Sequence, residues 1–100
     1  MRVEADGRDR LKLVMTEGAE TSELCLPVGL GARVLVETEG ITSERALRAA
    51  LGQESWALVE TILQRLEDRD VLYRDAKRGL LINTLPAPAQ RRIRELIETR

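Results

Sequence analysis

The stretch GQESWALVETILQRLEDRDVLYRDAKRGLLIN, residues 52–83, carries the clearest structural signal in the chain. Within residues 54–69 the apolar side chains recur at the 3.6-residue spacing of a helix with one buried face. That stripe consists of Trp56, Val59, Ile62, Leu63 and Leu66. The segments VLYR, DAKRG and LLIN then predict a hairpin whose basic tip contains Gly79. We therefore expect a long amphipathic helix followed by a two-stranded hairpin.

Toward the N-terminus, two segments alternate apolar residues with others. They are RLKLVMT, residues 10–16, and ELCLPV, residues 23–28. This period of two predicts strands, and the turn-like sequence between them predicts an antiparallel hairpin. Pro27 lacks a backbone N–H, so the second strand should end there or lie at a sheet edge. Residues 1–9 are polar, and we expect them to form a flexible N-terminus.

The segment GLGARVLVETEG, residues 29–40, fits two structures. Leu30, Val34 and Leu35 have helical spacing, whereas Val34 and Val36 suit a strand. We favour a short helix that Gly40 stops.

A clearer helix is predicted within ITSERALRAALG, residues 41–52. Thr42 is the expected N-cap, with Ile41 before it able to pack onto Ala46, and Gly52 marks the C-terminal end. Its expected buried face consists of Ala46, Leu47, Ala50 and Leu51.

The chain closes with PAQRRIRELIETR, which predicts an amphipathic helix whose apolar stripe is Ile93, Leu96 and Ile97. This helix either braces the core or forms the seam of a homodimer. Together these elements predict an α+β fold in which residues 10–100 form one domain.

Composition argues against several classes of function. The chain has 100 residues and a formal net charge of −1, so it has no general attraction to nucleic acid or anionic lipid. It contains no histidine, so the commonest general base and the commonest zinc ligand are both missing. It contains one cysteine, Cys25. We expect no enzymatic activity, no cofactor and no metal. A lone thiol and the absence of long apolar segments favour the cytoplasm and exclude a membrane protein.

The outer face of the 54–69 helix lacks the side chains that read DNA bases. This face presents Ala57, Thr61, Gln64 and Asp68, flanked by Leu58 and Glu60. Base edges are read best by Arg, Lys, Asn and Gln, and phosphates need cations. Only Gln64 qualifies, and acidic side chains dominate residues 53–72, where only Arg65 and Arg69 oppose them.

The order of elements resembles a winged helix-turn-helix domain over residues 30–83, and LQRLEDRDVLYR looks like the turn from helix into wing. The preceding hairpin together with EGITSERALRAALGQESWALVETILQRLEDRDVLY is similar to the PqqD-like recognition domains of peptide-maturation systems. The resemblance implies an N-terminal β-hairpin, a three-helix core, a wing hairpin and a closing helix. It also implies that a leader peptide binds between a sheet edge and the third helix.

The leading hypothesis is thus a non-enzymatic module that binds a leader-like peptide or a partner protein, such as a peptide-modifying enzyme, by strand addition. The candidate groove residues are Leu24, Leu26, Trp56, Leu58 and Glu60. Glu60 and its acidic neighbours would favour a basic peptide. For Trp56 we favour a core position at the start of the stripe, and the alternative is an interface anchor.

The competing hypothesis is a DNA-binding transcription regulator that contacts phosphates through its wing. Arg74, Lys77 and Arg78 would make those contacts, with little sequence preference. The alternative explanation of these charges is that they are simply solvated.

Overall fold

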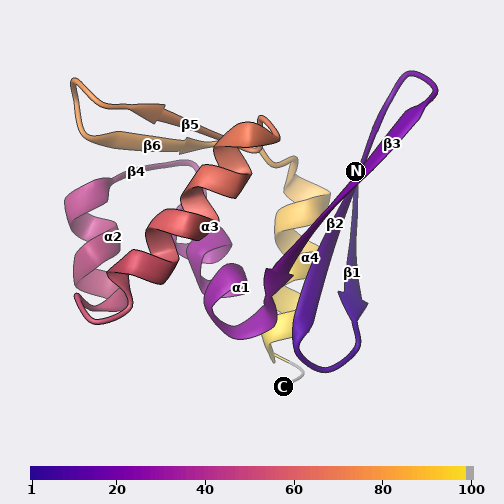
Figure 1. Cartoon of the computed structure of the whole chain (residues 1–100), viewed down its shortest axis with the longest axis horizontal. Coiled ribbons are helices and arrows are strands. Elements are labelled where there is room, and N and C mark those ends of the chain that lie inside the picture. Colours follow the sequence, from indigo (N-terminus) through magenta and orange to yellow (C-terminus); the bar gives the residue numbers. More distant parts are fainter. Residues whose placement is uncertain (99–100) are drawn as a thin grey trace.

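The structure is a computed structural model of the chain, and it describes residues 1–98 apart from the side chain of Glu17. Over these residues the fold is α+β, with four helices and two small antiparallel sheets of three strands each (Figure 1). The end of the predicted closing helix, residues 99–100, lies outside the described residues. No helix in residues 1–98 combines the length and apolar character needed to cross a membrane.

The predicted N-terminal hairpin is confirmed as β2 (Arg10–Glu17) and β3 (Glu20–Pro27). Leu24 and Leu26 lie opposite Leu13 and Leu11 in its register, and all four side chains are buried. β3 ends at Pro27 and lies at the edge of the sheet, as the missing N–H indicated.

A third strand takes the place of the flexible N-terminus that we expected over residues 1–9. β1 (Arg2–Asp6) pairs antiparallel with β2, so the strand order is β1-β2-β3. Val3 lies opposite Leu13 and is buried against the core. The sequence RVEAD gave little indication of a strand, because it contains two apolar and three charged residues.

The favoured helix in the ambiguous segment is confirmed as α1 (Val28–Glu37). It follows β3 directly and packs close against the end of that strand. A Cβ atom at Gly31 would lie 2.7 Å from Cβ of Leu26, so only glycine permits this approach. At the other end of α1, the buried Thr38 hydroxyl donates to the Val34 carbonyl at 2.7 Å.

The start of the next helix, α2 (Glu44–Leu51), differs from the expectation. Ser43 is its N-cap, and the Ser43 hydroxyl accepts from the backbone N–H of Ala46 at 3.0 Å. Thr42 instead belongs to β4 (Ile41–Ser43), which pairs with a later strand. Because Ile41 is 68% exposed, the expected packing of Ile41 onto Ala46 is wrong.

The buried face of α2 is narrower than predicted. Leu47 and Leu51 are buried as expected, whereas Ala46 and Ala50 are exposed. Small alanines fit a helix surface as well as a core, so their spacing alone did not decide their burial.

The long helix and the hairpin after it are confirmed as α3 (Trp56–Asp68), β5 (Leu72–Asp75) and β6 (Leu80–Asn83). All five residues of the predicted stripe on α3 are buried, including Trp56. β6 lies between β4 and β5 in the second sheet. Gly79 has a positive φ of 66° in the turn that joins β5 to β6.

The last helix is α4 (Ala87–Glu98), and it lies between the first sheet and α1 (Figure 1). Ile93 is buried, while Leu96 and Ile97 are partly buried against the same core. That core is continuous and joins the four helices to both sheets. It holds β3 and α3 in fixed positions, which matters for the surface between them.

Candidate functional site

Among the described residues, no strand pairs with the edge of β3 that faces away from β2. The N–H of Val28 donates to the carbonyl of Asp9 at 2.9 Å, so residue 28 points toward β2. Because backbone direction alternates along a strand, Leu24 and Leu26 also point toward β2. Glu23 and Cys25 therefore direct their N–H and C=O groups away from the sheet, toward the side on which α3 lies (Figure 1).

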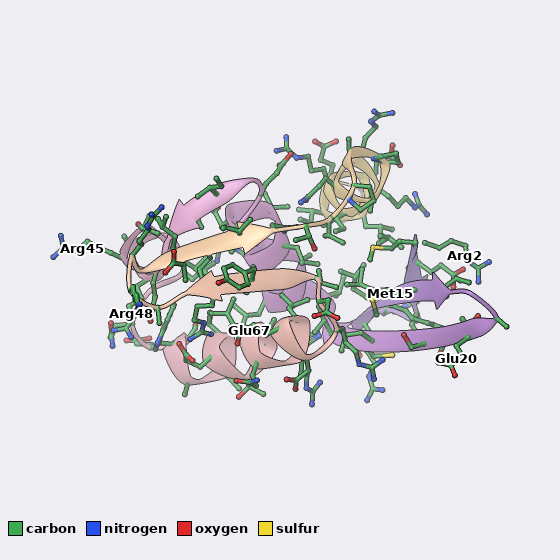
Figure 2. The ribbon with its side chains drawn as sticks, turned by 90° about the horizontal axis from the view of Figure 1, so that it is seen from above. Arg2, Met15, Glu20, Arg45, Arg48 and Glu67 are labelled. Atoms are coloured by element: carbon green, nitrogen blue, oxygen red, sulfur yellow. The ribbon has the colours of Figure 1, made fainter. Side chains whose placement is uncertain are left out.

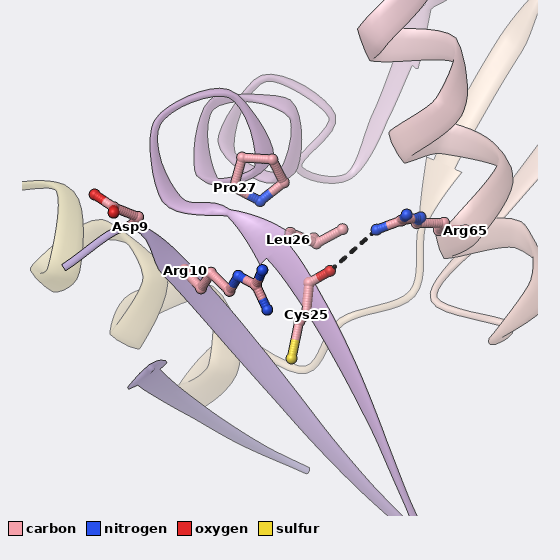
Figure 3. Close-up of a pocket in the computed structure, with 6 residues that line it drawn as sticks. All are labelled: Asp9, Arg10, Cys25, Leu26, Pro27 and Arg65. Carbon is pink, nitrogen blue, oxygen red and sulfur yellow. Dashed lines mark hydrogen bonds between the residues drawn. The ribbon is translucent and has the colours of Figure 1, made fainter. Parts of the chain in front are cut away.

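Three adjoining hollows follow this edge, between β3 and α3. We call them together the β3–α3 groove, and Arg65 of α3 borders each of them. The central hollow, of about 360 Å³, is lined by Asp9, Arg10, Cys25, Leu26, Pro27 and Arg65 (Figure 3). A guanidinium nitrogen of Arg65 donates to the Cys25 carbonyl at 3.4 Å and bridges the groove there.

The hollow at the Pro27 end is almost entirely apolar and has a volume of about 260 Å³. Its lining combines the end of β3, the first turn of α1 and the outer face of α3: Pro27, Leu30, Leu58, Thr61, Ile62 and Arg65. Leu58 is 64% exposed, although the buried stripe runs along the same helix. This hollow can accept one aliphatic side chain without displacing the core.

The hollow at the opposite end is charged and has a volume of about 420 Å³. It is lined by Glu23, Leu24, Cys25, Arg65, Asp68 and Arg69. Two of its acidic groups have partners, because Glu23 lies 4.0 Å from the Lys12 ammonium and Asp68 accepts from the Gln64 amide at 2.9 Å. Among the described residues, Arg10, Arg65 and Arg69 form no ion pair.

The structure brings three of the five predicted peptide-binding residues to this groove. Leu24 and Leu26 border it from β3, with their side chains largely buried, and Leu58 borders it from α3. Trp56 lies elsewhere, 8% exposed at the start of α3, with the Arg48 guanidinium 4.4 Å above its ring. The core interpretation of Trp56 is therefore confirmed.

Glu60 lies on the other flank of α3, toward the β5–β6 hairpin. Its carboxylate is 3.3 Å from the Arg74 guanidinium, and a Glu67 carboxylate oxygen is 3.3 Å from Nε of the same arginine. Figure 2 shows Glu67 on α3, next to the hairpin strands. Glu60 and Glu67 thus serve to fasten the hairpin to α3.

The three residues of the DNA-binding alternative differ in their surroundings. Arg74 is held by Glu60 and Glu67, and Nε of Arg78 lies 3.8 Å from the Asp75 carboxylate. Lys77 is exposed in the turn between β5 and β6. Two of the three cations therefore already face carboxylates.

The sequence did not single out Arg65, which occupies the centre of the groove. A signal was nevertheless present, because Leu58, Thr61 and Arg65 follow one another at spacings of three and four on the outer face of α3. Arg10 and Arg69 were missed because only the folded sheet shows which strand lies beside α3.

The described residues contain no group of three or more His, Cys, Asp or Glu side chains placed to hold a metal ion. The thiol of Cys25 is half-buried, with its sulfur 4.0 Å from a carboxylate oxygen of Asp6. The groove thus offers hydrogen-bonding edges, an apolar hollow and arginines, which are the components of a binding surface. Comparisons with models of known protein families, with curated proteins and with solved structures found no match to this chain.

Proposed function

We propose that this chain is a non-enzymatic module that binds an extended peptide segment in the β3–α3 groove. The observation that carries the proposal is the free edge of β3, which borders a partly apolar groove against α3. The segment belongs to a leader-like peptide or to a partner enzyme, met in the cytoplasm.

Strand addition would use the backbone first. Glu23 and Cys25 each present one N–H and one C=O to an incoming strand, and these bonds require no particular peptide sequence. Alternate side chains of the added strand then point toward α3, where the hollow beside Leu58 accepts an apolar one. Affinity thus comes mainly from the backbone, and selectivity from the groove.

The arrangement of elements supports the winged-helix interpretation that accompanies this proposal. A three-stranded sheet precedes α1, α2 and α3, and the β5–β6 hairpin follows directly. In the recognition domains that the sequence resembles, the peptide lies between the sheet edge and the third helix. The corresponding position here is the β3–α3 groove.

The DNA-binding alternative receives less support. Phosphate contacts need available cations, and Arg74 is engaged by two glutamates of α3. The outer face of α3 borders the peptide groove through Leu58, Thr61 and Arg65, and of these three Arg65 is the one whose side chain commonly reads base edges.

Selection from a randomised dodecapeptide display library tests the proposal. We expect the full chain to select binding peptides, and the substitution Leu58→Asp to weaken a selected peptide by about tenfold, because a charge in the apolar hollow opposes burial. Ile41→Asp is the matched control, since Ile41 is equally exposed but lies on β4. The proposal fails if no peptide is selected, or if Leu58→Asp and Ile41→Asp bind a selected peptide equally well.

A further inference from the structure

The charges of the β3–α3 groove indicate what kind of peptide it holds, an inference that rests on the proposed function. We infer that the groove selects an acidic segment, in which an Asp or Glu side chain binds Arg65 and a nearby aliphatic side chain fills the hollow beside Leu58. The structure gives the basis for this in the position of Arg65, in the other charges of the groove and in the β3 edge.

Arg65 is the central side chain of the groove. It borders the apolar hollow, the central hollow and the charged hollow. Among the described residues, its hydrogen-bond partner is the neutral carbonyl of Cys25, at the long distance of 3.4 Å. A guanidinium binds a carboxylate more strongly than a carbonyl, because two parallel hydrogen bonds and opposite charges then act together.

The acidic and basic side chains of the groove are not paired with one another. Glu23 faces Lys12, and Asp68 accepts from the neutral amide of Gln64 and keeps its charge. The carboxylate of Asp9 is turned away from Arg65, whereas Arg10 extends toward Cys25 (Figure 3). Arg10 lines the central hollow and Arg69 the charged hollow, so the groove holds, with Arg65, three arginines without ion-pair partners among the described residues.

This conclusion replaces the basic peptide that Glu60 suggested from the sequence. Glu60 faces Arg74 on the opposite flank of α3, so its charge is balanced away from the groove. Charge complementarity at the groove itself therefore favours an acidic ligand.

Arg65 also links charge recognition to strand addition. In the free protein it covers the Cys25 carbonyl, one of the acceptors that an added strand needs. A peptide carboxylate that draws the guanidinium to itself releases this carbonyl for a backbone N–H of the same peptide. Peptides without an acidic group must displace Arg65 without compensation, and they bind less well.

The test compares selections from a randomised dodecapeptide display library on the native chain, on Arg65→Glu and on Arg45→Glu. Arg45 is the matched control, because it projects from α2 at the end of the molecule opposite the first sheet (Figure 2). We expect the native chain and Arg45→Glu to enrich Asp or Glu close to a large aliphatic residue. Arg65→Glu should enrich Lys or Arg at that position instead.

One selected peptide then gives the size of the effect. Replacing its acidic residue by the corresponding amide should weaken binding to the native chain by about tenfold, and binding to Arg65→Glu by less than about twofold. Circular dichroism confirms that both variants are folded.

Several outcomes would overturn the inference. Peptides selected without acidic enrichment, or with the same enrichment on Arg65→Glu, would show that the groove binds peptides regardless of charge and would leave the proposed function intact. A 12-nucleotide oligo-dT that displaces the peptide at equal concentration would show unspecific attraction of polyanions. Failure to select any peptide on any of the three chains would overturn the proposed function, and this inference with it.

Discussion

The two flanks of α3 carry similar residues but are used in opposite ways. On the flank toward the β5–β6 hairpin, Glu60 and Glu67 share one cation, Arg74, so both carboxylates have a partner inside the chain. On the flank toward β3, the contact of Arg65 within the described residues is a long hydrogen bond to a carbonyl, and Leu58 is 64% exposed. The flank toward the hairpin uses its charged side chains to hold the fold together. On the flank toward β3, the corresponding side chains remain accessible.

This difference shows why the net charge of a helix is a poor guide to what the helix binds. Taken as a whole, α3 is acidic at its surface and appears suited to a basic partner. Once the glutamates are assigned to the hairpin, the groove keeps three arginines, Arg10, Arg65 and Arg69, without ion-pair partners among the described residues. Pairing within the fold has to be subtracted before a surface charge is assigned to a ligand.

The largest expected effect on stability comes from truncating a residue in the buried stripe of α3, which supports both flanks of the helix. Leu66→Ala should lower the free energy of unfolding by about 2–5 kcal/mol, because Leu66 is fully buried and truncation leaves a cavity. Urea denaturation followed by circular dichroism measures this loss. Leu58→Ala on the same helix should change stability by less than about 0.5 kcal/mol. Equal losses of unfolding free energy in the two variants would contradict the placement of Leu58 on the exposed flank of α3 that faces β3.

A smaller effect on stability is expected where α1 meets β3, a contact that lies only on the side of α3 that faces β3. Gly31→Ala places a Cβ atom 2.7 Å from Leu26 and should cost about 1–3 kcal/mol, since α1 or β3 must shift. Thermal unfolding compares it with Gly29→Ala, where a Cβ meets nothing within 4 Å. In that control, helix propensity should raise stability by about 0.5–1 kcal/mol. If both alanines stabilise the chain, the close approach described here is incorrect.

The two flanks can be compared directly through their arginines. Arg74→Met should destabilise the chain by about 1 kcal/mol, because Glu60 and Glu67 lose their common cation and the pairs are only partly exposed. Arg65→Met should change stability by less than about 0.5 kcal/mol. Urea denaturation at low salt and in 1 M NaCl checks both, and the Arg74→Met loss should shrink in high salt. A larger loss in Arg65→Met would reverse the assignment of the two flanks.

The least invasive test needs no substitution. Hydrogen exchange followed by NMR should show fast exchange at the amides of Glu23 and Cys25, which point to the free edge. The amides of Leu24 and Leu26, bonded to β2, should be protected. Binding of a selected peptide should then slow exchange at Cys25. Protection at Cys25 in the free chain would mean that another element already covers the edge.

Periodicity predicted most of the fold, and the failures have identifiable causes. The stripe on α3 was confirmed because five large apolar residues at helical spacing allow one arrangement. β1 was missed since its pattern rests on Val3 and Ala5 alone, and its stability comes from pairing with β2. The N-cap of α2 moved from Thr42 to Ser43 because pairing of β4 with β6 keeps Thr42 in a strand.

The candidate site was less predictable than the fold. Leu24, Leu26 and Leu58 border the groove, and their role in peptide binding stays a prediction. Glu60 was assigned to the wrong flank, because its partner Arg74 lies 14 residues away in sequence and only the hairpin brings them together. Arg65 was overlooked for the same reason, since its position relative to Cys25 spans 40 residues.

Pro27 limits the alignment of any strand that adds to β3. It is the last residue of the strand, and it has no N–H to offer to the free edge. If the added strand shifted by one residue, all of its side chains would point to the opposite face. If it shifted by two residues toward α1, one of its carbonyls would face the proline ring, which has no N–H to donate. In the proposed binding mode, the position of Pro27 therefore makes the spacing of residues in the peptide, as well as its composition, decide which peptide binds.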